Sequence, residues 1–207
     1  ELGRFQPWFV EQLLGCDVAA EEVERVEGLF SALIDAALAQ PRVLVHRDFH
    51  SRNLMALPGD KLAVIDFQDA VAGPLTYDLV SLLRDCYIRW PAQKVDAWAL
   101  AYRERLLGAG FGQVPEAGDF LRAFDWMGLQ RHLKVLGTFA RLYLRDGKRA
   151  YLADLPLVID YVLEILDKYA GSEPAFGDFG SWLRARLLPA SADQEWSAGS
   201  RRRALRH

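Results

Sequence analysis

Three polar side chains follow one another in the first third of the sequence, and their types and spacing suit phosphate chemistry. Asp48 is followed five residues later by Asn53, and Asp66 comes thirteen residues after that. Between them, Pro58-Gly59-Asp60 is a strong turn sequence flanked by apolar stretches, so it predicts a β-hairpin over residues 53–67. Because a hairpin brings its far ends together, we expect Asn53 and Asp66 to lie side by side, with Asp48 a short loop away.

This arrangement predicts a magnesium site that serves phosphoryl transfer. Mg²⁺ prefers hard oxygen ligands, keeps several waters and takes further ligands from substrate phosphates. In phosphoryl transfer one aspartate orients the attacking hydroxyl, while an asparagine and a second aspartate hold the ions that bridge the phosphates. Asp48 suits the first role, because orientation matters more than base strength when the proton leaves late. Asn53 and Asp66 suit the second.

Two histidines leave other interpretations open. The pattern His46-x-Asp48-x-His50 is also typical of a cluster that binds Zn²⁺ or Mn²⁺ in a hydrolase. The spacing of Asn53 and Asp66 favours the magnesium interpretation instead. His50 is expected either to be a loop residue hydrogen-bonded to the backbone or to face the acceptor substrate.

The elements that must position these residues are mainly helices. An aromatic-rich, amphipathic stretch predicts a short helix over 5–14 that ends at Gly15, and apolar periodicity predicts a long helix from Val23 that Pro41 stops. The β-branched run 43–45 leads into the loop that carries Asp48. Further helices are predicted over 77–89, 91–107, 118–145 and 156–169.

The spacing of the polar residues also matches a known signature. His46-Arg47-Asp48 stands four residues before Asn53, and Ile65-Asp66-Phe67 follows. This pattern resembles the catalytic loop and the metal-binding aspartate of protein-kinase-like enzymes. Gln68 stands where protein kinases have glycine, so the pattern is more similar to the aminoglycoside phosphotransferase and choline kinase-like family.

Longer stretches narrow the resemblance. HRDFHSRNLM, VIDFQDAVAGPLTYDLVSLLRDCY and GLQRHLKVLG are similar to bacterial kinases of cell-wall recycling that phosphorylate the anomeric hydroxyl of N-acetylmuramate or N-acetylglucosamine with ATP. The similarity extends over residues 1 to about 170.

The resemblance implies a role for each residue of the motif. Asp48 would be the catalytic carboxylate and His46 would brace its loop; Asn53 and Asp66 would bind Mg²⁺. Met55 and Ile65 would form the apolar floor under adenine, Asp78 would tether the loop by hydrogen bonds, and His50 and Arg131 would contact the acceptor. The segment 118–145 carries more basic than acidic residues, which suits a neutral or carboxylate-bearing sugar better than a polycationic aminoglycoside.

A kinase of this kind also needs a glycine-rich loop over the phosphates and a strand lysine paired with a helix glutamate. The sequence before His46 contains neither, and it begins with Glu1 rather than Met. We therefore expect the C-terminal lobe of a longer enzyme, inactive alone, whose partner is its own N-terminal lobe. The expected divisions are a linker helix over 1–15, a catalytic lobe over 16–180 and a solvated basic tail over 181–207.

Composition excludes several other classes. The 207 residues are 51% hydrophobic with a net charge of -3, which is typical of a globular protein and gives no reason to expect a nucleic-acid partner. Two cysteines at positions 16 and 86 favour buried free thiols in a reducing compartment rather than disulfides. No apolar run is long enough to span a membrane. The expected location is the cytoplasm.

The sequence thus predicts a mainly α fold with a short β-hairpin, the C-terminal lobe of a protein-kinase-like fold. The predicted function is ATP- and Mg²⁺-dependent phosphorylation of a sugar hydroxyl. A kinase for another hydroxyl (aminoglycoside, choline or homoserine) and a non-catalytic kinase-like binding module remain alternatives.

Overall fold

The computed structural model describes residues 1–197 and divides into two compact units. Unit 1 combines residues 1–32 with the chain from Leu129 onward, and unit 2 comprises Leu33–Gly128. Their boundaries fall within two helices, α1 (Ala20–Leu38) and α4 (Ala117–Asp146).

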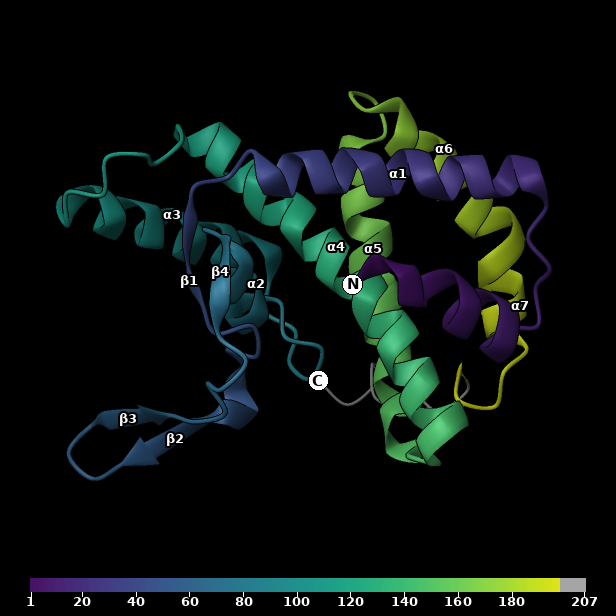
Figure 1. Ribbon diagram of the computed structural model, residues 1–207, viewed down its shortest axis with the longest axis horizontal. Coiled ribbons are helices and arrows are strands. Elements are labelled where there is room, and N and C mark those ends of the chain that lie inside the picture. Colours follow the sequence, from purple (N-terminus) through teal and green to yellow (C-terminus); the bar gives the residue numbers. More distant parts are fainter. Residues whose placement is uncertain (198–207) are drawn as a thin grey trace. The chain divides into compact units, whose positions relative to one another are not determined.

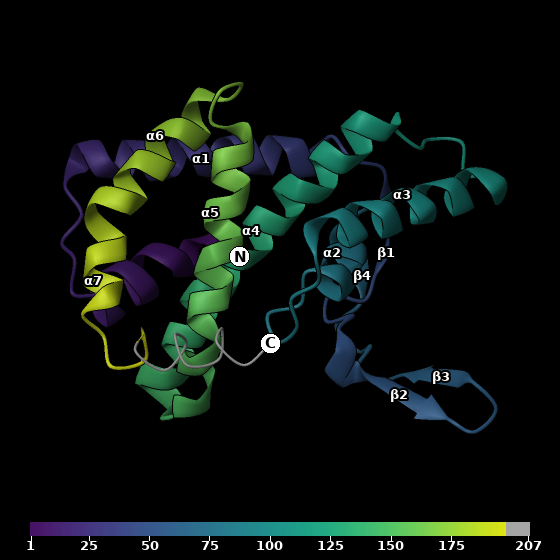
Figure 2. The same cartoon turned by 180° about the vertical axis from the view of Figure 1, so that it is seen from behind.

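Unit 2 contains two antiparallel strand pairs and the helices beside them (Figure 1). β1 (Arg42–Val45) pairs with β4 (Val71–Pro74), and β2 (Leu54–Leu57) pairs with β3 (Lys61–Val64). A 3₁₀ turn, η3 (Ser51–Asn53), precedes β2. The helices that follow are α2 (Tyr77–Leu83) and α3 (Ala92–Gly108). The opposite view shows that the β2–β3 hairpin is a separate ribbon from the β1–β4 pair (Figure 2).

The core of unit 2 forms on the β1–β4 side. Val45 of β1 is buried with Val80 of α2, Ala99 of α3 and Phe124 of α4. Gln40 and Thr76 add a buried polar link, because the Thr76 N–H and hydroxyl both donate to the Gln40 side-chain oxygen, at 3.1 and 2.9 Å. This link fixes the start of β1 to the start of α2, the two elements that flank the loop carrying Asp48.

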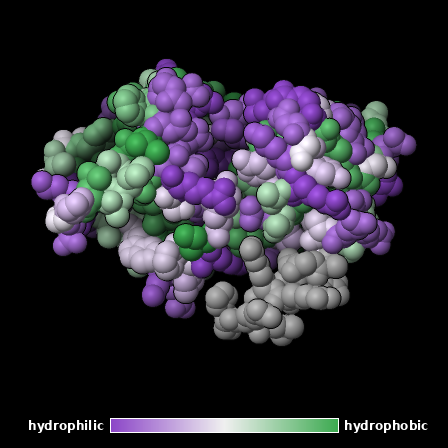
Figure 3. All heavy atoms as spheres, turned by 90° about the horizontal axis from the view of Figure 1, so that it is seen from below, coloured by the Kyte–Doolittle hydropathy of each residue, from purple (hydrophilic) through white to green (hydrophobic). Residues whose placement is uncertain are grey.

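The β2–β3 hairpin, in contrast, buries little of its apolar surface. Figure 3 shows hydrophobic atoms at the surface on the left, the side on which the hairpin lies. The exposed large apolar residues of this segment are Met55, Leu57, Leu62, Val64, Ile65 and Phe67.

All regular elements of unit 1 among the described residues are helices. It begins with η1 (Leu2–Arg4) and a π-helix, η2 (Phe5–Leu13), and it takes in most of α1 and the second half of α4. The later elements are η4 (Arg149–Asp154), α5 (Leu155–Tyr169), α6 (Pro174–Trp182), η5 (Leu183–Leu187) and α7 (Leu188–Ala192).

Aromatic side chains hold unit 1 together. The ring of Phe5 lies 5.7 Å from that of Phe9 and 5.9 Å from that of Phe179, and all three are fully or almost fully buried. Gly137 allows the N-terminal segment to pack closely on α4, because a Cβ at this position would lie 2.5 Å from the backbone carbonyl of Arg4. The N-terminal helix is therefore part of this core.

Most predicted elements are confirmed. The short N-terminal helix, the long helix before Pro41, the hairpin and the helices near 91–107, 118–145 and 156–169 are all present. The helix predicted over 77–89 is wrong in its second half, because α2 ends at Leu83 and Arg84 leaves the helical conformation. The pairing of β1 with β4 was not predicted.

Three further expectations need correction. Residues 181–192 are not a solvated tail, because Trp182, Leu183 and Leu187 are buried there; the terminal RRRALRH lies outside the described residues. The apolar helical faces on which Trp90, Trp98 and Trp126 fall in the sequence predict core packing for all three. Trp126 is buried, but Trp90 and Trp98 are each 40% exposed and contact each other edge to face. Cys86 is buried as expected, but Cys16 is only partly buried.

None of the helices within residues 1–197 combines the length and apolar character needed to cross a membrane.

Glu22 secures the start of α1. Its carboxylate accepts the Ala19 backbone N–H at 2.9 Å and the Trp182 indole N–H at 3.0 Å, and it lies 3.3 Å from the Arg186 guanidinium. The Ala19 hydrogen bond is one half of a capping box. This bond, with further contributions from Trp182 and Arg186, lowers the pKa of Glu22 from its ordinary value of 4.5.

The close approach at Gly137 predicts a large effect of one methyl group. Gly137→Ala is expected to destabilise the protein by about 2 kcal/mol, because backbone atoms of Arg4 would have to move. Gly28→Ala is the matched control: nothing lies within 4 Å of its Cβ position, and it should stabilise α1 by about 0.5–1 kcal/mol. Thermal unfolding of both variants tests this, and equal effects would contradict the packing.

Glu22 predicts a pH dependence of stability. Since its pKa is lowered in the folded state, its contribution is complete above pH 4.5 and is lost as the pH falls through the folded pKa. Glu22→Gln should cost about 1 kcal/mol at neutral pH and nearly nothing once the pH is well below the lowered pKa of the folded state. Denaturant unfolding across this range measures the difference. Glu21→Gln, an exposed neighbour, should show a much smaller change; equal curves for the two variants would contradict the assignment.

Candidate active site

The loop that carries Asp48 is held at its start by the carboxylate of Asp78. The backbone N–H groups of His46 and Arg47 donate to the two oxygens of Asp78, at 2.7 and 3.0 Å. Asp78 lies in the first turn of α2, where the exposed N–H groups of the helix favour a negative charge. Burial, followed by the charge of Asp78, raises the pKa of Tyr102 on α3 above its usual value. The two hydrogen bonds from His46 and Arg47 to Asp78 are of the kind that the family resemblance implies for Asp78.

A second hydrogen bond joins the loop to the end of the hairpin. His46 Nε2 lies 3.0 Å from the carbonyl oxygen of Ile65, and because a carbonyl only accepts, this nitrogen carries the proton. Arg47, which follows His46, and Asp66, which follows Ile65, both have a left-handed backbone, with φ of 77° and 69°. Such conformations cost on the order of 1–3 kcal/mol each and are concentrated at functional sites.

The structure brings Asn53, Asp66 and the Asp48 backbone together, as the hairpin geometry predicts. Asn53 Nδ2 donates to the Asp48 carbonyl at 2.9 Å and lies 3.5 Å from Asp66 Oδ2. The Ile65 N–H donates to the Asn53 carbonyl at 3.1 Å, which continues the strand pairing beyond β2 and β3. Gln68 Nε2 donates to the other oxygen of Asp66 at 2.7 Å.

The side-chain oxygens of this group fit Mg²⁺. Both acceptors near the Asn53 amide face its NH₂ group, so its oxygen Oδ1 remains available as a ligand. Asp66 is exposed, and Asp48 is half-buried with no hydrogen bond to its carboxylate among the described residues. A hard amide oxygen beside a carboxylate is a donor set that Mg²⁺ accepts, with water and phosphate oxygens completing the shell.

The alternative zinc or manganese cluster is not supported. Within residues 1–197, no three His, Cys, Asp or Glu side chains lie together in a way that could hold a metal ion, so His46, Asp48 and His50 do not form such a group. The bond from His46 Nε2 to Ile65 explains part of this, because it turns one potential ligand nitrogen to the backbone.

The middle of the loop contacts a carboxylate that the sequence analysis missed. Ser51 Oγ donates to Asp85 Oδ2 at 2.7 Å, and Asp85 is only 2% exposed. The one signal in the sequence was an acidic residue inside the helix predicted over 77–89. The imidazole of His50 lies edge-on to the ring of Tyr87, with centroids 6.1 Å apart, and the His50 N–H donates to the Asp48 carbonyl at 3.0 Å.

The remaining predicted residues are placed as follows. Met55 lies on β2 opposite Ala63, and Ile65 follows β3; they are 49% and 42% exposed, so both are accessible to a ligand. Arg131 is nearly buried on α4 and belongs to unit 1, whereas the other predicted residues belong to unit 2. Its contact with an acceptor, like the adenine contact of Met55 and Ile65, stays a prediction.

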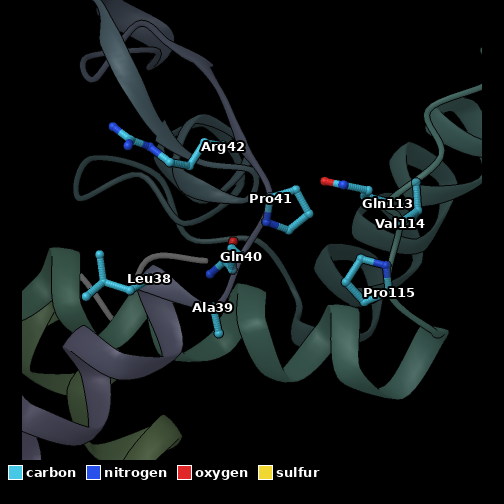
Figure 4. Close-up of a pocket in the computed structure, with 8 residues that line it drawn as sticks. All are labelled: Leu38, Ala39, Gln40, Pro41, Arg42, Gln113, Val114 and Pro115. Atoms are coloured by element: carbon cyan, nitrogen blue, oxygen red, sulfur yellow. The ribbon is translucent and has the colours of Figure 1, made fainter.

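A hollow of about 570 Å³ in unit 2 lies apart from these residues (Figure 4). It is lined by the end of α1 with the start of β1, residues 38–42, and by residues 113–115 before α4. None of the predicted site residues lines it. The candidate site is therefore an exposed loop and hairpin end rather than this hollow.

Comparisons with known proteins agree with this geometry. A family model described as "Phosphotransferase enzyme family" (APH) matches residues 1–123, which include the loop, the hairpin and α2. N-acetylmuramate/N-acetylglucosamine kinase from Neisseria meningitidis is 43% identical over 200 residues, 96% of this chain and 57% of that protein. The protein with the same name from Pseudomonas aeruginosa is 41% identical over 93% of this chain and 55% of its own length. The one from Caulobacter vibrioides is 30% identical over 76% of this chain and 41% of its own length.

The chain thus spans about half the length of the curated relatives it matches. The matched family model covers more than half of the chain and contains the Asp48–Asn53–Asp66 group together with Asp78. This chain belongs to the phosphotransferase enzyme family.

Proposed function

We propose that the intact enzyme transfers the γ-phosphoryl group of ATP, with Mg²⁺, to the anomeric hydroxyl of N-acetylmuramate or N-acetylglucosamine. The observation that carries the proposal is the group formed by Asn53, Asp66 and the Asp48 loop, in a chain 41–43% identical to two kinases named for these sugars. A glycine-rich loop and a lysine–glutamate pair would complete the phosphate site in the intact enzyme.

The residues of this chain divide the work between orientation and metal binding. Asp48 accepts the hydrogen bond of the sugar hydroxyl and directs its oxygen at the γ-phosphorus; it takes the proton late in the transfer. Asn53 Oδ1 and the Asp66 carboxylate would hold Mg²⁺, which neutralises the charge of the β- and γ-phosphate oxygens when bound. Asp78 and His46 keep the loop in place through the hydrogen bonds described above.

The exposed apolar hairpin supports the nucleotide part of the proposal. Met55 and Ile65 present apolar surface close to Asn53 and Asp66, where the adenine of ATP would lie with its phosphates at the metal. ATP is abundant in the cytoplasm and neither cysteine of the chain forms a disulfide, so we place the enzyme there.

The acceptor is tested with the intact enzyme, ATP and Mg²⁺. ADP release is expected with N-acetylmuramate and N-acetylglucosamine, and phosphorus NMR should place the phosphate on the anomeric oxygen. The 1-O-methyl glycoside of N-acetylglucosamine is the matched control, because it lacks only the anomeric hydroxyl, and it should give no turnover. Turnover of this glycoside, or faster turnover of choline, homoserine or an aminoglycoside, would contradict the proposed acceptor.

Asp48 is tested by Asp48→Asn, which keeps the shape of the side chain and removes its charge. The kcat is expected to fall by about 10²–10⁴-fold, while the Kd for ATP stays within about threefold, because Asp48 contacts the acceptor rather than the nucleotide. Steady-state kinetics and calorimetric ATP binding measure the two quantities. Asp35→Asn, an exposed position on α1, is the control for a charge loss elsewhere. A kcat close to that of the unmodified enzyme would rule out the role of Asp48.

A further inference from the structure

The catalytic loop is fixed at a second point, between Asp48 and Asn53. Both the hydroxyl and the backbone N–H of Ser51 donate to Asp85 Oδ2, at 2.7 and 3.4 Å. The other oxygen, Asp85 Oδ1, accepts the backbone N–H of Tyr87 at 3.3 Å. We call the hydrogen bonds between Ser51 and Asp85 the loop clasp.

The residues on both sides of Ser51 contact the same turn. The guanidinium carbon of Arg52 lies 3.4 Å from the centroid of the Tyr87 ring, and the His50 ring meets Tyr87 edge-on. Three consecutive loop residues therefore lie against the segment that follows α2. The helix ends at Leu83, Arg84 leaves the helical conformation, and the Asp85 carboxylate that follows contacts the loop.

The turn itself is rigidly held within unit 2. Arg84, next to Asp85, makes an ion pair of 2.5 Å with Asp125 on α4, and both side chains are buried. The Arg84 guanidinium also lies 4.8 Å from the centroid of the Phe124 ring. Asp85 is thus attached to a fixed part of the core.

Burial of Asp85 indicates a purpose other than packing. A buried carboxylate is costly even when hydrogen-bonded, and an apolar residue of similar size often serves stability better. The donors that compensate Asp85 are one residue of the catalytic loop and one N–H of its own turn. Ser51 is itself exposed, so its hydroxyl contributes this contact and little to the core.

We propose that Asp85 is a positioning residue that acts through Ser51 to set the separation of Asp48 from Asn53. Ser51 begins the 3₁₀ turn η3, and the Asn53 N–H donates to the His50 carbonyl at 3.0 Å, so a shift of Ser51 moves Asn53 directly. Asp78 fixes the loop before Asp48, and Asp85 fixes it after Asp48. The role of this clasp in turnover rests on the proposed kinase function.

Ser51→Ala and Ser51→Thr in the intact enzyme provide the sharpest test. Ser51→Ala removes only the hydroxyl, and its kcat should fall about 10-fold or more, with the KM values for ATP and the sugar within about twofold, because misplacement of a catalytic group reduces turnover rather than binding. Ser51→Thr keeps the hydroxyl and should restore kcat to within about threefold of the unmodified value. Asp85→Asn should resemble Ser51→Ala.

Hydrogen exchange of residues 46–53 supplies a readout that needs no substrate. Ser51→Ala should speed exchange in this loop and leave the helices of unit 2 unchanged, whereas Ser51→Thr and the control Asp35→Asn should exchange like the unmodified enzyme. The proposal is overturned if Ser51→Ala leaves either loop exchange or kcat unchanged. It is also overturned if Ser51→Ala lowers the melting temperature at full kcat, or if Ser51→Ala and Ser51→Thr lose kcat equally. An unmodified enzyme that phosphorylates no sugar would instead overturn the proposed function, and the exchange experiment would still test the clasp.

Discussion

A loop without regular secondary structure needs partners for its backbone, and here one carboxylate supplies the first two of them. Asp78 accepts the N–H groups of His46 and Arg47, and the rest of the site depends on this constraint. It places Arg47 in a left-handed conformation and directs the His46 ring at the Ile65 carbonyl, which in turn joins the loop to the hairpin end. Two charge-assisted hydrogen bonds of about 1.5–3 kcal/mol each are enough to offset the backbone strain nearby.

The proposed catalytic group is built from the ends of elements rather than from their interiors. Asp48 lies in the loop after β1, Asn53 ends η3 and Asp66 follows β3. Asp78 lies in the first turn of α2, and Asp85 follows the end of that helix. Element ends have free backbone groups and side chains that can face solvent, so they can hold a substrate that helix interiors would exclude. The helices and the β1–β4 pair serve to keep these ends at fixed separations.

How much of the fold and of the site the sequence predicted depends on how far apart along the chain the interacting residues lie. The hairpin, and with it the approach of Asn53 to Asp66, followed from one local turn, and the long helices followed from apolar periodicity. The β1–β4 pairing and the Asp85 contact could not be predicted, because each joins segments about thirty residues apart without a local pattern. The early end of α2 escaped detection for the same reason. The sequence favours a helix over 77–89, but contacts of the turn with Ser51 and Asp125, both distant in the sequence, override that preference.

The contacts that shape the loop share one further property. The bonds from Asp78 and Asp85 to the loop span only 31 to 34 residues of chain, and all of these residues lie in unit 2. Closing a segment of this length costs little more entropy than closing one half as long. Short stretches of chain within unit 2 are therefore enough to close the loop, and its tethers use no residue of unit 1.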